Sequence, residues 1–186
     1  LEEVMNELVQ EQARELVTKL KLKDNQLQIK NKQLNEIQSK LDEIVSTNEQ
    51  VLVENSIDKN VLYVANTDDS TGKFGITFKR MDERLKEHKR DFGSQFTLKY
   101  VIHTELYIEL EKAIKLSCVT EGSVLYDRRI KKKYNNKTQT ELILLDDDFT
   151  IDCLYKEILN IKEICERDVY NSQKEEIRRL KGIIGN

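Results

Sequence analysis

Apolar residues recur at heptad spacing through residues 1–54, a stretch that contains no glycine. Such spacing over several turns is typical of a coiled coil, in which two rows of side chains form the contact between helices. One row consists of four leucines and the second row includes two lysines; the rows are Leu20, Leu27, Leu34 and Leu41, and Leu16, Lys23, Lys30, Ile37 and Ile44. We expect a coiled coil that joins two chains into a homodimer, with the lysines weakening the contact while fixing its register. The alternative is a single amphipathic helix that lies on the rest of the protein.

After residue 55 the pattern changes to short apolar strands that alternate with amphipathic helices. In the strand predicted over 94–104, the side chains expected on one face are Phe96, Leu98, Tyr100 and Ile102. The other predicted strands are 60–66, 73–77 and 140–145, and the predicted helices are 79–92, 105–118, 123–134 and 149–182. This order predicts an α+β fold, a small antiparallel β-sheet flanked by helices and preceded by the long coiled-coil helix.

These elements divide the chain into three expected parts. Residues 1–54 form the coiled coil, residues 55–148 the globular domain, and residues 149–186 a C-terminal helical extension. The chain opens in helical rhythm without an initiator methionine, so we expect further chain upstream.

Composition narrows the class of protein. Charged residues make up 35% of the chain, yet the formal net charge is only -3, so bulk charge does not indicate a polyanion binder. The three cysteines, Cys118, Cys153 and Cys165, have no metal-binding spacing and indicate reduced thiols in an intracellular protein. No apolar run approaches the length of a membrane span, so we expect no membrane partner.

The order of elements resembles the GIY-YIG nuclease superfamily, and most closely its branch in tailed phages and large DNA viruses. The two tripeptides that name the family match Val61-Leu62-Tyr63 and Lys73-Phe74-Gly75. The family's helical arginine, followed one turn later by a histidine, matches Arg84 and His88, and its metal-binding glutamate matches Glu111 in "ELEKAIK". Valine replaces the first glycine and lysine replaces the second tyrosine.

One further match lies near the end of the globular domain. The viral branch has an acidic residue that opens an apolar strand, and Glu141 in "TELILL" is similar. The resemblance covers about residues 60–148.

The resemblance implies a metal-dependent DNA endonuclease of viral or phage type, which hydrolyses phosphodiester bonds. Its catalytic residues would be Tyr63, Lys73, Arg84, His88 and Glu111, with Glu111 holding one divalent ion, Mg²⁺. Arg84 offers a fork of donors that fits a phosphate, and Tyr63 would orient the attacking water. His88 would shuttle a proton or hydrogen-bond the phosphate. Lys73 would act as a base if its pKa were lowered, and otherwise as a positive charge on phosphate.

A basic run at residues 127–136 predicts a surface for the DNA backbone. Its candidate nucleic-acid-binding residues are Arg128, Arg129, Lys131, Lys132 and Lys133. Such a cluster neutralises phosphates without reading base sequence. DNA is therefore the expected partner, in the host cytoplasm or nucleus if the protein is viral.

Each candidate residue also has a structural interpretation, and two other functions remain open. Glu111 can be a solvated helical glutamate, Tyr63 a core residue, and Gly75 either a bulge or a point of close approach. One alternative function is a non-catalytic DNA-binding protein in which Lys73 has replaced the working tyrosine. The other is a coiled-coil scaffold whose globular end docks a partner.

Overall fold

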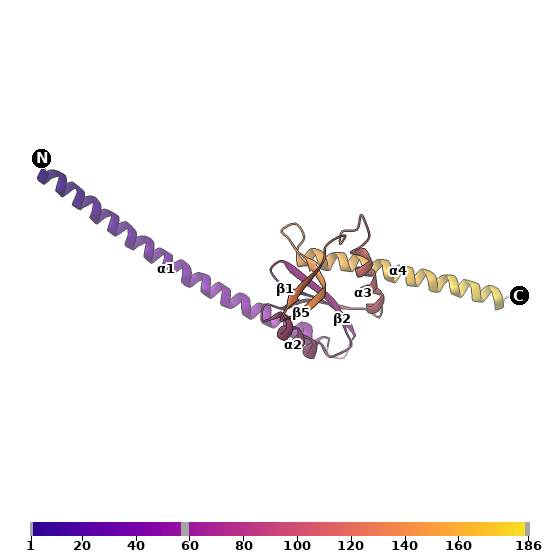
Figure 1. Cartoon of the computed structure of the whole chain (residues 1–186). Helices are drawn as coiled ribbons and strands as arrows, with labels where there is room; N and C mark the ends of the chain where they lie inside the picture. Colours follow the sequence, from indigo (N-terminus) through magenta and orange to yellow (C-terminus); the bar gives the residue numbers. More distant parts are fainter. Residues whose placement is uncertain (1, 57–59, 185–186) are drawn as a thin grey trace. The chain divides into compact units, whose positions relative to one another are not determined.

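A computed structural model describes residues 2–56 and 60–184, and the side chains of residues 10–56 and 60–180. The chain divides into two compact units after Asn48 (Figure 1). The division lies six residues before the expected boundary at 54/55, because the last turns of the first helix belong to the second unit. Each unit is described by itself below.

The first unit is one helix. Helix α1 spans Glu2–Glu54 without interruption, which confirms the predicted long helix. The apolar residues of the two heptad rows are 51–64% exposed, so nothing in the described residues covers them. Pairing with a second chain stays a prediction.

The second unit is built on a five-stranded antiparallel sheet, and the predicted α+β class is confirmed. Its strands lie in the order β3-β1-β2-β5-β4. Their bounds are β1 Val61–Asp68, β2 Thr71–Thr77, β3 Thr97–His103, β4 Arg129–Tyr134 and β5 Lys137–Leu144. Strand β1 is central in the group β3-β1-β2, which explains why "VLYVA" is an unbroken apolar run rather than an alternating one.

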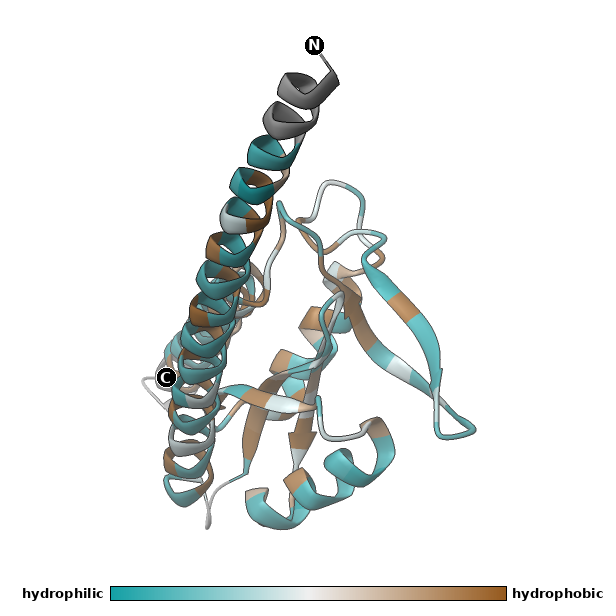
Figure 2. Ribbon diagram, turned by 90° about the vertical axis from the view of Figure 1, so that its left-hand side faces the viewer, coloured by the Kyte–Doolittle hydropathy of each residue, from teal (hydrophilic) through white to brown (hydrophobic). Residues whose placement is uncertain are grey.

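Helices cover both faces of this sheet (Figure 2). On one face, α3 (Tyr107–Ser117) and α4 (Ile151–Ile184) pack on Leu62, Val64 and Phe74. On the other face, α2 (Met81–Phe92) and the last turns of α1 pack on Val61, Tyr63 and Ala65. The alternation along β1 therefore sends side chains into two separate clusters.

Helix α4 is more than an appended extension. Its first half contributes Leu154, Ile158 and Ile161 to the core, and these side chains are 0–8% exposed. Its second half carries exposed residues such as Tyr170 and Ile177. None of the helices in the described residues carries the long uncharged apolar run that a bilayer span requires.

The prediction that four alternate residues of the third strand share one face of the sheet is wrong at one end of the strand. A bulge at Lys99 separates the pairs Val64↔Tyr100 and Ala65↔Leu98. The extra residue reverses the alternation, because two residues of β3 then lie opposite one step of β1. Leu98 consequently packs on the α2 side, while Ile102 packs on the α3 and α4 side.

The helix predicted over 123–134 is also wrong, because a β-hairpin forms instead. Strand β4 begins at Arg129 and pairs with β5, while residues 119–127 form turns. The connection is Asn135–Asn136, with φ of 45° and 63°, a backbone that asparagine tolerates and that matches the twist of a two-residue hairpin turn. The side-chain Nδ2 of Asn135 donates to the carbonyls of Arg90 and Asp91, so the hairpin tip is fixed to the end of α2.

Candidate active site

A buried hydrogen bond joins β1 to α2. The hydroxyl of Tyr63 lies 2.6 Å from Nε2 of His88, and these residues are 0% and 4% exposed. His88 lies in the buried stripe of α2, four residues before Phe92 on the same helical face, and its ring also contacts Phe96 at a centroid distance of 4.9 Å. An aromatic cluster therefore fixes the histidine ring.

The protonation of this pair follows from its surroundings. Burial, with the nearby charges of Arg84 and Lys73, lowers the pKa of His88 to about 3. Burial raises the pKa of Tyr63 above its usual value. At neutral pH the hydrogen bond therefore joins an uncharged phenol to a neutral imidazole. Both side chains are almost completely buried, so direct contact with a phosphate is unfavourable for either of them.

Gly75 makes room for the Tyr63 ring. The two residues are partners across β1 and β2, and a Cβ on Gly75 would lie 2.7 Å from the Tyr63 hydroxyl oxygen. No bulge interrupts the pairing at this position. Of the two interpretations offered by the sequence, close approach is the one that the structure has, and the approaching group is a protein side chain.

A chain of charged side chains begins at β2 and crosses to α3. Nζ of Lys73 lies 3.4 Å from Oε2 of Glu141 on β5, and Oε1 of Glu141 lies 2.8 Å from Nζ of Lys115. Lys115 also lies 3.4 Å from Oε2 of Glu111, one turn earlier on α3. Lys115 thus bridges the two carboxylates. The sequence signal for it was the Glu111–Lys115 spacing of four residues, which places both side chains on one helical face.

Burial distinguishes the members of this chain. Lys73 is 3% exposed and Glu111 has a side chain that is 15% exposed, whereas Glu141 and Lys115 are both 31% exposed. Burial lowers the pKa of Lys73, although the carboxylate of Glu141 opposes that change. Burial alone would raise the pKa of Glu141, but the hydrogen bond from Lys115 and the charge of Lys73 bring it below its usual value.

The charge of Arg84 acts on both the buried pair and Lys73, whose pKa it helps to lower. One guanidinium nitrogen donates to Oε2 of Glu87 at 3.0 Å, and the charge of Arg84 is close enough to favour ionised Tyr63. Its Nε is buried and donates to no acceptor in the described residues. The side chain is 32% exposed, so part of the fork remains accessible to a ligand.

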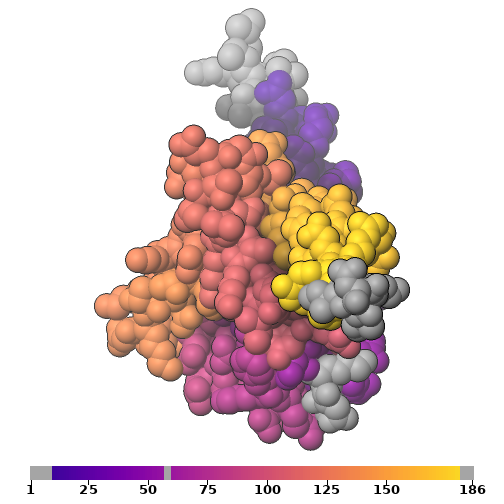
Figure 3. Space-filling model, turned by 90° about the vertical axis from the view of Figure 1, so that its right-hand side faces the viewer, coloured from indigo at the N-terminus to yellow at the C-terminus, as the bar shows by residue number. Residues whose placement is uncertain are grey.

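The sheet opens beside these residues. Strand β5 pairs with β2 only from Thr71 to Lys73, so the second half of β2 has an unpaired edge on that side. Next to this opening, β5 has two residues, Thr140 and Glu141, opposite Lys131 of β4. Such bulges re-aim side chains and are over-represented beside active sites. In Figure 3 the surfaces of the hairpin (orange), the α3 segment (salmon) and the β2–α2 segment (magenta) adjoin on one face.

The five predicted DNA-binding residues separate into two groups. Arg128 pairs with Asp146 at 3.0 Å and Lys132 pairs with Asp68 at 2.6 Å, so both are engaged within the protein. Arg129, Lys131 and Lys133 alternate along β4 and are exposed, and of these Arg129 also donates from Nε to the carbonyl of Thr140 at 3.0 Å. Their row lies opposite to Ile130 and Tyr134, which pack on the α2 side.

The basic row borders a hollow between the hairpin and the end of α3. The hollow has a volume of about 440 Å³ and is lined by Cys118, Val119, Asp127, Arg129, Lys131 and Thr140. Thr140 is the neighbour of Glu141 in sequence. The row therefore begins beside the charged chain and follows the edge strand away from it.

Two carboxylates are the side chains that could hold a hard divalent ion here. Glu111 and Glu141 both contact the Lys115 ammonium, so two carboxylates converge on a single positive charge. Mg²⁺ commonly takes one or two carboxylates from protein and completes its shell with water and substrate phosphate. No group of three or more acidic, histidine or cysteine side chains suited to a metal occurs in the described residues.

The structure thus brings together all five predicted catalytic residues, from β1, β2, α2 and α3. It adds Lys115 and gives Glu141 a place between Lys73 and Lys115. Comparisons of the chain with protein-family models, with curated proteins and with solved structures found no match.

Proposed function

We propose that this protein is a metal-dependent DNA endonuclease of the GIY-YIG type. The observation that carries the proposal is the network of Lys73, Glu141, Lys115 and Glu111 beside the open edge of β2, with the charge of Arg84 near enough to act on Lys73. Buried titratable groups with shifted pKa values, gathered beside exposed charges, are typical of functional sites and are costly in a merely structural domain.

Each group has a task in phosphodiester hydrolysis. The Arg84 fork binds the phosphate and stabilises the charge that develops on it. Glu111 and Glu141 would hold the divalent ion, which supplies Lewis-acid stabilisation when bound. The lowered pKa of Lys73 leaves a larger fraction of its amine unprotonated at neutral pH than in an ordinary lysine, as removal of a proton from the attacking water requires.

Tyr63 and His88 are positioning residues in this proposal. Their buried hydrogen bond holds the helix face of Arg84 against β1, and neither group needs to touch DNA. The exposed row Arg129, Lys131 and Lys133 supports the backbone of the bound strand, so DNA is held without base readout. Such a protein acts in the cell compartment that holds its DNA, the host cytoplasm or nucleus if it is viral.

The test is nicking of supercoiled plasmid by the full chain with Mg²⁺ or Mn²⁺. We expect the wild type to nick, and Glu111→Ala and Arg84→Ala to lose about 10²–10³ in rate, because each removes stabilisation of transition-state charge. Glu109→Ala is the matched control, since Glu109 is an exposed glutamate on the same helix and should nick as the wild type does. Nicking that is indifferent to Glu111→Ala would contradict the proposal.

One observation favours the non-catalytic alternative, a protein that binds DNA without cutting it. The ammonium of Lys115 lies between Glu111 and Glu141, where the divalent ion would be held. In that case the wild type does not nick but retards the plasmid, and the retardation weakens steeply with salt. Absence of both nicking and retardation would instead favour the scaffold with a docking cap.

A further inference from the structure

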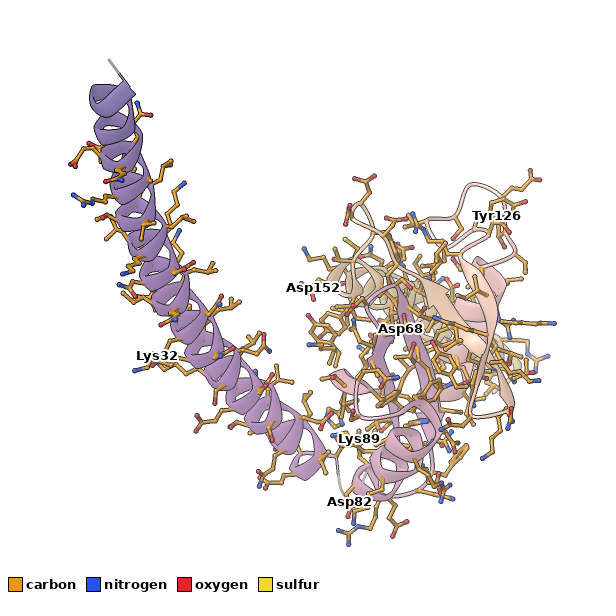
Figure 4. All side chains as sticks on the ribbon, turned by 60° about the vertical axis from the view of Figure 1, so that its left-hand side comes forward. Lys32, Asp68, Asp82, Lys89, Tyr126 and Asp152 are labelled. Atoms are coloured by element: carbon orange, nitrogen blue, oxygen red, sulfur yellow. The ribbon has the colours of Figure 1, made fainter. Side chains whose placement is uncertain are left out.

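Helix α1 exposes two parallel rows of side chains that differ in one respect. The first row is leucine throughout, at Leu20, Leu27, Leu34 and Leu41. The second row is interrupted by adjacent lysines; it is Leu16, Lys23, Lys30, Ile37 and Ile44. The apolar members are all at least 51% exposed, and the side chains project from the helix on all sides (Figure 4). Only the second row carries charge.

A parallel pair of such helices would place like charges together. In a parallel, in-register coiled coil each residue of a row faces the same residue of the other chain. Lys23 would then face Lys23 of the second copy, and Lys30 would face Lys30, in two successive layers of the contact. Two ammonium groups close together in a partly dry contact repel each other strongly.

An antiparallel pair removes this conflict completely. With the chains reversed, each residue of one row faces a residue of the other row. Since the first row has no lysine, every lysine then faces a leucine. A lysine stem packs well along a leucine while its ammonium reaches water at the edge.

We propose that residues 10–48 associate with the same segment of a second copy as an antiparallel coiled coil. The register that uses the whole exposed stretch pairs residues whose numbers sum to 57. The first row continues N-terminally to Ala13, seven residues before Leu20. The layers are Ala13–Ile44, Leu16–Leu41, Leu20–Ile37, Lys23–Leu34 and Leu27–Lys30, each occurring twice. Every layer contains at least one leucine or isoleucine.

The flanking positions do not reverse this preference. The antiparallel register brings Lys19 near Lys40 of the second copy, whereas a parallel register would bring Lys19 near Asp24. Both are exposed pairs at the rim, where an ion pair is worth about 0–1 kcal/mol and salt screens it. The lysines inside the contact therefore decide the orientation.

The orientation determines where the two globular units are attached. Residue 48 of one copy would lie opposite residue 9 of the other, so the two residues 48 are about 60 Å apart along the coil at 1.5 Å per residue. A parallel pair would attach both units at the same end. If the proposed nuclease function holds, the antiparallel pair favours single-strand nicks at separate positions over a paired double-strand cut.

The test is disulfide trapping in the full chain carrying Lys23→Cys and Leu34→Cys together. These residues are eleven positions apart on one straight helix, about 16 Å, so they cannot link within one chain. After oxidation, we expect a disulfide-linked dimer in which the peptide containing position 23 is joined to the peptide containing position 34. Mass spectrometry of the linked peptides distinguishes these bonds from any made by Cys118, Cys153 or Cys165.

Two results would overturn the inference. Links of position 23 to 23 and of 34 to 34, without the mixed link, would establish a parallel pair. A monomer in sedimentation of the unmodified chain would remove the second copy altogether. Ser39→Cys is the control, because Ser39 lies on the outer side of the helix and should give no link in either orientation. Neither experiment measures nicking. A failure of the antiparallel inference can therefore be told apart from a failure of the proposed nuclease function.

Discussion

Arg84 and His88 are four residues apart on α2, yet they have different surroundings. The buried stripe of the helix is Met81, Leu85, His88 and Phe92, so the histidine points into the sheet. Arg84 lies at the border of this stripe and keeps part of its guanidinium exposed. Helical spacing therefore predicts that the two side chains are neighbours, but it does not predict that the histidine would be buried and the arginine partly exposed.

Burial of His88 in its neutral form makes the stability of the protein depend on pH. Its folded pKa of about 3 lies below the value near 6.5 of an unfolded histidine. Between these values the unfolded state binds more protons, so the free energy of unfolding falls as pH is lowered through this window, by up to about 1.4 kcal/mol per pH unit. We expect His88→Gln to show a flatter dependence between pH 6.5 and 4 than the wild type.

The measurement is urea unfolding at several pH values for both proteins. The acidic groups that titrate in the same window are common to both, so the difference between the two curves isolates His88. Tyr63→Phe serves as a comparison, since it removes the hydrogen bond but keeps the histidine, and it should retain most of the slope. Parallel curves for the wild type and His88→Gln would contradict a buried neutral imidazole.

At the scale of elements, hydrophobic pattern predicts the strands and helices that enclose the core. Strands β1, β2 and β5 and helices α2, α3 and α4 were all predicted from apolar spacing. Strand β4 was not, because its run "RIKKKY" has only two hydrophobic side chains, Ile130 and Tyr134, and it forms the edge of the sheet, where charge is favourable. The useful signal was the Asn135–Asn136 turn, which is typical of a hairpin.

The same limit applies to the site. Motif order predicts that Tyr63, Lys73, Arg84, His88 and Glu111 share one site, but the position of Lys115 beside Glu141 depends on the three-dimensional path of β5. The bulge that aims Glu141 toward Lys115 depends on the pairing of β5 with β4. A pairing register of that kind is decided by packing along two strands and cannot be read from either one alone.

Alternation along β4 leads to a prediction for DNA binding. Lys131 and Lys133 are exposed, whereas Lys132 is held by Asp68 through a hydrogen bond that also helps to keep the pKa of this aspartate below its usual range. If the exposed row contacts phosphates, Lys131→Ala with Lys133→Ala should weaken binding to all DNA sequences. The slope of log affinity against log salt should fall by about 1 for each lysine lost.

The matched control is Lys132→Ala, one position away in the same run. This substitution should leave the slope of log affinity against log salt near that of the wild type. It should instead reduce stability at neutral pH, because the ionised carboxylate of Asp68 then lacks its lysine partner. Salt-dependent retardation of labelled duplex measures the first effect and thermal unfolding the second. Equal slopes for the double variant and the wild type would exclude the exposed row as the DNA contact.

At the scale of the whole molecule, the second unit takes in the last turns of α1. Glu49 is 9% exposed, accepts a hydrogen bond from the backbone N–H of Leu98 at 2.9 Å, and pairs with Lys89, which Figure 4 labels. Leu52 and Val53 pack on the cluster at the α2 face. The heptad pattern runs through residue 51 and does not show where the helix stops being exposed and begins to pack on the globular unit. A coiled-coil contact and a packed core both favour apolar residues at helical spacing.

This arrangement predicts that Glu49→Ala destabilises the globular unit although it lies within the long helix. The substitution leaves the Leu98 N–H without its buried acceptor and removes the partner of Lys89, so we expect a loss of about 1–3 kcal/mol in the free energy of unfolding. Gln50→Ala is the control, since Gln50 is exposed one position later and should change stability by less than about 0.5 kcal/mol. Chemical denaturation of both variants measures the difference. If the two substitutions prove equally mild, the hydrogen bond and ion pair of Glu49 do not stabilise the globular unit, and only the packing of Leu52 and Val53 holds the last turns of α1 to it.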